Sequence, residues 1–154
     1  MATSLSVLLA LFASPVTTPE GVEELLTRLL GFFSERQLFR AVVLVDEGGV
    51  SCAVAEASRR TFFQARPRRA ASHALVCSRA RGVQVAGQGH SKETYTVWPT
   101  HFCTCHDHQH SVISKGEQLM CKHQLACLIS SAMGTHSTVL MSDTLFASLL
   151  EQTC

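Results

Sequence analysis

The sequence predicts an α+β fold in which helices flank a small antiparallel sheet. Apolar residues recur at helical spacing near both ends of the chain and after Cys121, and short apolar runs with Gly-containing turns lie between them. With 154 residues, of which 46% are hydrophobic and 16% charged, the chain can form a packed core and is too apolar for a disordered tail. Because the net charge is only +1, attraction to nucleic acid would depend on a local patch.

The first apolar stretch, residues 5–13, allows two interpretations. It resembles the core of a secretory signal, but no Lys or Arg precedes it and no small-residue cleavage site follows cleanly. It is also too short to span a bilayer. We therefore favour an apolar N-terminal helix that packs on the domain or on a partner. The seven cysteines are an odd number, which disfavours a closed disulfide framework and favours a reducing, intracellular setting.

A second helix is predicted to begin at Pro19, because Thr17 and Thr18 supply an N-cap hydroxyl and Glu20 an acid in the first turn. One apolar stripe follows at helical spacing: Val22, Leu25, Leu26, Leu29, Leu30 and Phe33. Residues 41–45 then form an apolar run that ends in Asp-Glu-Gly-Gly, and residues 50–55 form another. We expect these two runs to make a β-hairpin, and residues 61–64 to form a further strand.

The next part of the chain is basic. Residues 57–92 contain eight Lys or Arg residues and no acid. Within them we expect residues 66–82 to form an Arg-rich loop, partly helical over residues 70–77. Such a stretch could neutralise phosphates, with Phe62 and Phe63 stacking on unpaired bases. The alternative is a solvated linker or nuclear-import segment, with at least one of these Phe rings in the core.

The C-terminal half alternates strands and helices. Residues 83–86 and 94–98 are predicted strands on either side of a Gly-Gln-Gly turn. A helix follows Cys121 and stops at Gly134, its apolar positions being Leu125, Leu128, Ile129, Ala132 and Met133. Ser142 and Asp143 cap a last helix with one apolar face, formed by Leu145, Phe146, Leu149 and Leu150.

The chemistry concentrates in two Cys/His pairs. Cys103 and Cys105 are separated by one residue, so on an extended strand both sulfurs project from the same face. Fifteen residues intervene before Cys121, and one residue separates Cys121 from His123. This second pair opens the helix, whose dipole favours the thiolate form of Cys121. Three thiolates and an imidazole match one tetrahedral, structural Zn²⁺ site with no position left for water. Unrelated buried cysteines beside a histidine are the alternative, which two closely spaced pairs disfavour.

These residues resemble the SWIM zinc finger, whose pattern is C-x-C-x(n)-C-x-H. The resemblance rests on Tyr95-Thr96-Val97, on Cys103-Thr104-Cys105 and on the run from Cys121-Lys122-His123 to Ala126. It implies a β-hairpin followed by a helix that together clasp zinc. We accordingly divide the chain into an N-terminal helix and hairpin region (1–65), the Arg-rich loop or insertion (66–82), the SWIM-type finger (83–133) and a C-terminal helix (134–154).

The context around the finger resembles the small SWIM-domain subunit of the Shu complex. The resembling features are the amphipathic N-terminal helix, Leu44-Val45-Asp46, the run from Ser91 to Thr96, and the Ser-Asp-capped last helix. The resemblance implies a nuclear, non-catalytic zinc protein that pairs with a RecA-like recombinase paralogue. The pair would promote recombinase assembly on single-stranded DNA in homologous recombination and DNA damage repair, with direct DNA contact left open.

The sequence departs from that family in the Arg-rich segment and in His106, His108 and His110, which follow the first Cys pair. The three histidines could form a second metal site or exchange with the first ligand set, but a solvated polar turn is the interpretation we favour.

Other functions remain in competition. A SWIM-domain adaptor in a ubiquitin-ligase or transposase-derived assembly is the main alternative, and a secreted Cys-rich protein would rest on residues 5–13 alone. An enzyme is disfavoured, because the sequence contains no G-x-S-x-G, P-loop, H-E-x-x-H or paired-carboxylate pattern. We also expect no membrane partner.

Overall fold

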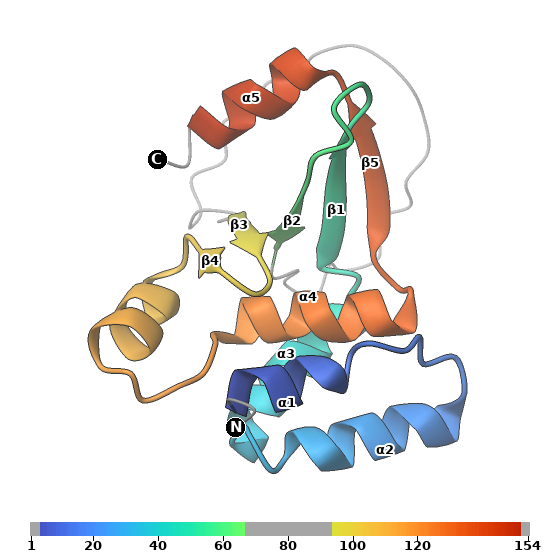
Figure 1. Ribbon diagram of the computed structural model, residues 1–154, viewed down its shortest axis with the longest axis vertical. Helices are drawn as coiled ribbons and strands as arrows, with labels where there is room; N and C mark the ends of the chain where they lie inside the picture. The colour runs from blue at the N-terminus through green and yellow to red at the C-terminus, as the bar shows by residue number, and fades with distance from the viewer. Residues whose placement is uncertain (1–3, 67–93, 152–154) are drawn as a thin grey trace, which may run out of the picture.

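The computed structural model describes residues 4–66 and 94–151. They form a five-stranded sheet in the order β4-β3-β2-β1-β5, with helices on both of its faces (Figure 1). The elements are, in chain order, α1 (Ser4–Ala10), α2 (Pro19–Leu29), α3 (Glu35–Asp46), β1 (Val50–Ala55), β2 (Thr61–Ala65), β3 (Tyr95–Trp98), β4 (Phe102–Cys103), the π-helical turn η1 (His108–Ser114), α4 (Lys122–Met133), β5 (Ser137–Met141) and α5 (Asp143–Glu151). The predicted α+β class is confirmed.

The two N-terminal helices agree with the sequence analysis. Leu8 of α1 is fully buried in the core, so the apolar N-terminal stretch packs on the domain as we favoured. The predicted cap of α2 is present, because the Thr18 hydroxyl accepts a hydrogen bond from the Gly21 amide at 3.2 Å. Within the described ranges, the structure has no helix both long and apolar enough to cross a membrane.

The predicted hairpin strand over residues 41–45 is wrong, because those residues lie in α3. Ser34 caps this helix by accepting a hydrogen bond from the Gln37 amide, and its buried positions Leu38, Ala41 and Leu44 recur at helical spacing. The Gly pair does turn the chain, but from α3 into β1. A Cβ on Gly49 would lie 2.5 Å from the carbonyl oxygen of Arg66, so only Gly fits at this helix-to-strand corner.

The sheet is mixed and not purely antiparallel as predicted. β1 pairs antiparallel with β2, and β2–β3 and β3–β4 are also antiparallel, but β1 pairs parallel with β5. Strand β5 was missing from the sequence analysis. Strands from the N-terminal (1–65), finger (83–133) and C-terminal (134–154) segments therefore share one sheet.

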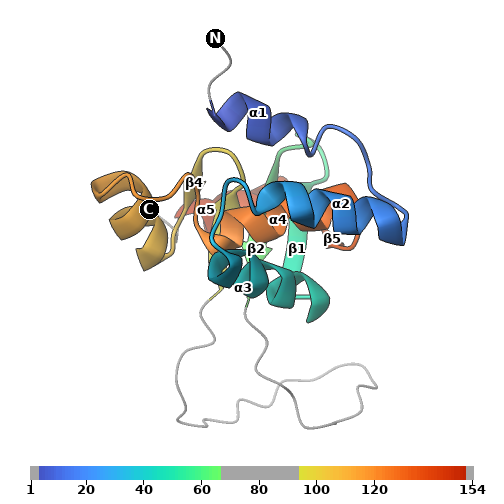
Figure 2. The same ribbon diagram turned by 90° about the horizontal axis from the view of Figure 1, so that it is seen from below.

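Alternating residues of the strands divide the core between the two faces of the sheet. The face toward α3 and α4 carries Val50, Ala65, Val97 and Cys103, which belong to the larger apolar cluster. The opposite face carries Ala53, Ala55, Phe62 and Met141, which pack against Phe146 of α5. In Figure 2, the view from below, α1 and α3 lie on opposite sides of α4.

The C-terminal elements confirm most of the prediction. Gly134 ends α4 in the left-handed conformation at φ 64°, and the Ser142 hydroxyl accepts from the Leu145 amide at the start of α5. The apolar face of α5 is only partly buried, because Phe146 is in the core whereas Leu145 is 51% exposed. The predicted strand over residues 83–86 and almost all of the Arg-rich loop lie outside the described residues.

Candidate metal centre

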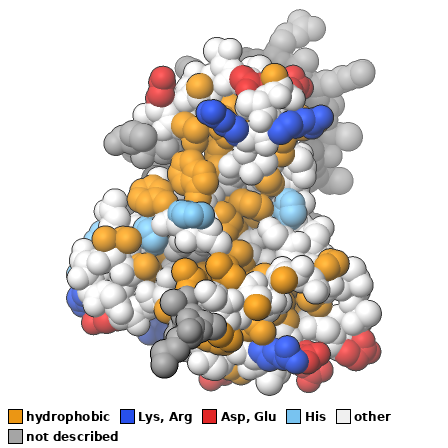
Figure 3. Space-filling view, in the orientation of Figure 1, with side chains coloured by type: hydrophobic (Ala, Val, Ile, Leu, Met, Phe, Trp, Pro, Cys, Tyr) orange, Lys and Arg blue, Asp and Glu red, His pale blue; other side chains and the backbone are white. Residues whose placement is uncertain are grey.

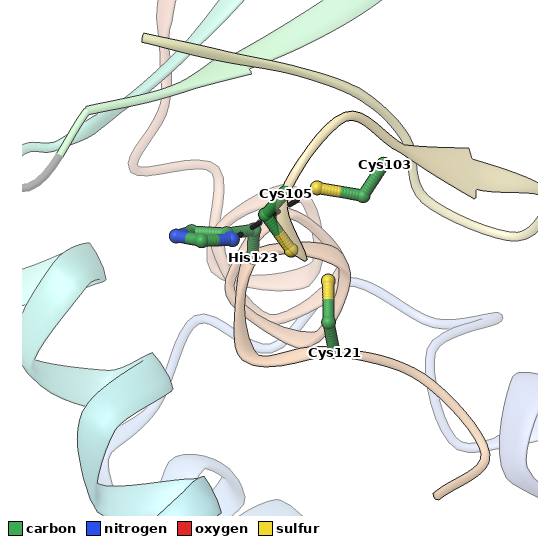
Figure 4. Close-up of side chains that lie close together, drawn as sticks. All are labelled: Cys103, Cys105, Cys121 and His123. Carbon is green, nitrogen blue, oxygen red and sulfur yellow. Dashed lines mark hydrogen bonds between the residues drawn. The ribbon is translucent and has the colours of Figure 1, made fainter. Parts of the chain in front are cut away.

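The structure brings the four predicted ligands together between the β3–β4 hairpin and the start of α4. Cys103 ends β4, Cys105 lies two residues further on, Cys121 is the N-cap of α4 and His123 is in its first turn. All four side chains are buried, and their ligand atoms lie within 4.8 Å of one another. In the close-up the three sulfurs and one ring nitrogen of His123 face a common point (Figure 4). Among the described residues this is the only group of three or more Cys, His, Asp or Glu side chains close enough to share an ion.

Local pairing explains this convergence. Val97 pairs with Cys103 across the hairpin. The Thr104 amide donates to the Thr96 carbonyl oxygen at 3.1 Å, so the strand pairing continues beyond the end of β4. The Thr104 hydroxyl accepts from the Thr96 amide, also at 3.1 Å. These bonds place Cys103 and Cys105 on the side of the hairpin that faces α4.

The histidine is oriented for coordination through one nitrogen. Nδ1 of His123 lies 3.9 Å from Sγ of Cys103, while Nε2 points away from the sulfurs. The Tyr95 ring packs over the imidazole with a centroid distance of 4.4 Å and fixes its plane. Tetrahedral zinc with bonds of about 2.3 Å to sulfur needs ligand atoms about 3.8 Å apart, so a small contraction of this cluster would complete the site. The residues present therefore fit zinc.

The electrostatics of the three thiols also favour a cation. A hydrogen bond with Cys105, a second with Cys121 and burial raise the pKa of the Cys103 thiol, whereas hydrogen bonds from Cys103 and Cys121 lower the pKa of Cys105. At Cys121 a hydrogen bond with Cys103 opposes the shift, but the bond with Cys105 and burial raise its pKa to about 12. Because the pKa is raised at two of the thiols and lowered at the third, a bound divalent cation would favour the deprotonated form of all three sulfurs.

His108 is a structural contributor that the sequence analysis placed in a solvated turn. That interpretation is wrong for this residue, which is 1% exposed at the start of η1. Its amide donates to Sγ of Cys105 at 3.3 Å, and its Nδ1 lies 2.9 Å from Oε1 of Gln124. The same Gln124 oxygen accepts from the Cys121 amide at 3.1 Å. His108 and Gln124 therefore link both Cys pairs from behind the ligands.

Replacing His108 with Phe is expected to weaken zinc binding about tenfold, which is typical of a lost partner behind a metal ligand. The Phe ring would keep the edge contact with Phe102, now 5.5 Å between centroids, but would lose the bond to Gln124. Competition with a chromophoric chelator measures the affinity. The matched control is His110→Phe, since His110 is exposed, and equal zinc affinity in both variants would assign His108 to packing alone.

His106 and His110 do lie on the surface. Their rings stack at 5.6 Å, four residues apart on the helical turn, and both are exposed. For these two residues the favoured solvated turn agrees with the structure.

Ala126 lies one turn after His123 and is fully buried beside the Cys residues. Ala126→Leu is expected to lower the free energy of unfolding by about 1–3 kcal/mol, because the larger side chain would overpack the helix against the metal centre. Chemical unfolding measures the loss, with Ala126→Ser as the smaller step. Ser131→Leu, on the exposed side of α4, should change stability little, and equal effects at positions 126 and 131 would contradict a close contact.

The fold and the site together define a small zinc-finger protein whose buried Cys₃His centre joins a β-hairpin to a helix. No family model matches the chain, and no solved structure matches it either. Two curated relatives do. The chain is 30% identical to zinc finger SWIM domain-containing protein 7 of Danio rerio over 105 residues, which is 68% of this chain and 59% of the relative. It is 38% identical to the Homo sapiens protein of the same name over 56 residues, 36% of this chain and 40% of the relative.

The matched region thus spans less than two thirds of either relative. With the Cys₃His geometry, these similarities support a zinc-binding protein of the SWIM zinc finger type.

Proposed function

We propose that this protein is the non-catalytic SWIM subunit of a nuclear, Shu-type recombination-mediator complex. In this role it pairs with a RecA-like recombinase paralogue, and the pair promotes recombinase assembly on single-stranded DNA during homologous recombination repair. The proposal extends the resemblance of the sequence to the small SWIM subunit of that complex, and the similarity to two SWIM domain-containing relatives agrees with it.

The observation that carries the non-catalytic role is the closed metal centre. Three buried thiols and one buried imidazole converge on one point, so a single Zn²⁺ would have all four positions filled by protein. Zinc bound there holds the hairpin to α4 and offers no open position for water or substrate.

The surface supports a role as a subunit. Apolar side chains gather over the middle of the molecule between α5 and α4 (Figure 3). Large exposed apolar side chains on the sheet include Val139 and Leu140 of β5 and Phe102 of β4, with 46%, 60% and 38% of their area accessible. Exposed apolar surface of this kind is typical of proteins that bind a partner.

Affinity purification of the tagged full chain, with identification of the stable partner, tests the proposal. We expect a RecA-fold paralogue in wild type and in the matched control His110→Ala, and loss of that partner in His123→Ala. Recovery of a cullin or a transposase component instead would overturn the proposal in favour of a SWIM-domain adaptor.

A further inference from the structure

A polar cavity of about 410 Å³ lies beside the metal centre, where the N-terminal end of α3 meets the loop before α4. Its lining includes Ser34, Arg36, Gln37 and Arg40 from the start of α3, Asp107, and Lys122 at the start of α4. Neither the zinc ligands nor the proposed partner role accounts for it.

Hydrogen bonds hold the two elements that line the cavity in a fixed relative position. The side-chain nitrogen Nε2 of Gln37 donates to the Met120 carbonyl oxygen at 2.6 Å and to Gln118 Oε1 at 3.3 Å, which ties α3 to the loop that leads into Cys121. Arg36 and Arg40 are four residues apart, so both project from the same face of α3. Lys122 directly follows the ligand Cys121, which holds the start of α4 in place. The three cationic side chains are thus mounted on two helices that are joined to each other.

The charges in this cavity are unbalanced. Arg36, Arg40 and Lys122 face one carboxylate, that of Asp107, which accepts a hydrogen bond from the Ser111 hydroxyl. In the described part of the chain the ion pairs are Arg28–Glu24 and Lys115–Glu117, so none of the three cations is in one. The positive end of the α4 dipole adds to the same field. Closely spaced cations without carboxylate partners are suited to a ligand that carries several negative charges.

We propose that this cavity binds backbone phosphates of single-stranded DNA. The inference rests on the proposed function for the kind of polyanion, and on the cavity itself for the place of contact. Arg36 and Arg40 form hydrogen-bonded pairs with phosphate oxygens, and Lys122 supplies a third charge at the helix start. Since phosphate contacts do not read bases, binding at this site is independent of sequence and steeply dependent on salt. Its lining residues lie outside residues 66–82, for which DNA contact was one of two interpretations of the sequence.

The test is a salt titration of fluorescence anisotropy, with the zinc-loaded full chain and a labelled oligo(dT) strand. The pocket variant is Arg36→Gln/Arg40→Gln, and the matched control, Arg28→Gln/Lys115→Gln, removes the same charge from two other surface sites. Loss of two phosphate contacts is expected to lower the slope of log affinity against log salt by about 1.4. We expect affinity to fall about tenfold near 100 mM salt in the pocket variant and about twofold or less in the control. Lys122→Gln should add to the loss.

Each other outcome overturns the cavity as a DNA site. Equal affinities and slopes in pocket and control variants would do so, as would wild type that fails to bind oligo(dT). The cavity would also be excluded if Arg66→Gln/Arg68→Gln/Arg69→Gln lost DNA binding while the pocket variant bound DNA as wild type does. If the pocket variant binds DNA normally but loses the captured partner, the cavity contacts an acidic protein segment instead. Partner identification judges the proposed function independently, because wild type can capture a RecA-fold paralogue whether or not this cavity binds DNA.

Discussion

His123→Ala is expected to abolish stoichiometric zinc binding and to unfold the region that contains the hairpin and α4. Structural zinc contributes on the order of 10 kcal/mol to folding in isolated fingers, which is comparable to the whole stability of a domain this size. The reason is visible in the core, because Cys103, Cys105 and Cys121 are part of the same apolar cluster as Leu125. Without zinc the cluster would bury three thiols that no longer share a cation.

Elemental analysis of the purified variant and circular dichroism measure this outcome, and Cys105→Ser should behave in the same way. The matched control is Cys52→Ala, which removes a buried cysteine outside the cluster and should keep one zinc per chain. His123→Ala with unchanged zinc content and an unchanged spectrum would show that the ligand assignment is incorrect.

Phe62→Ala is expected to lower the free energy of unfolding by about 3–5 kcal/mol, the range typical of a fully buried aromatic ring. Phe62 is 1% exposed, and its ring lies 4.9 Å from that of Phe146 in α5 and 6.1 Å from that of Trp98 in β3. Its removal would leave a cavity between the sheet and α5, on the face opposite the zinc centre. Zinc content should therefore stay at the wild-type value while stability falls.

Denaturant unfolding monitored by Trp98 fluorescence provides the measurement. Phe39→Ala is the matched control, because Phe39 is 67% exposed and its loss should change stability by no more than about 0.5 kcal/mol. Similar unfolding free energies for the two variants would contradict the placement of Phe62 in the core.

Local chemistry made much of this molecule predictable. Thr18 and Pro19 mark the start of α2, and Gly134 marks the end of α4. Each of these residues acts on backbone groups within one helical turn of its own position. The four metal-centre residues were likewise predictable, since close spacing within each pair limits how far apart the ligands can lie.

The misassigned elements depend on distant contacts. Residues 41–45 include Val42, Val43 and Val45, whose β-branched side chains favour a strand, but burial of Leu38, Ala41 and Leu44 against α4 makes them helical. Strand β5 is exposed at four of its five positions, so it shows no alternation of burial, and its partner β1 lies more than eighty residues earlier in the chain. His108 has no neighbour in sequence that predicts its bond to Gln124, sixteen residues away.

Zinc K-edge X-ray absorption on the purified full chain tests the central claim most directly. The Cys₃His assignment predicts one zinc per chain with three sulfur neighbours at about 2.3 Å and one nitrogen at about 2.0 Å. A first shell of nitrogen and oxygen alone, or a preparation with no zinc, would contradict it.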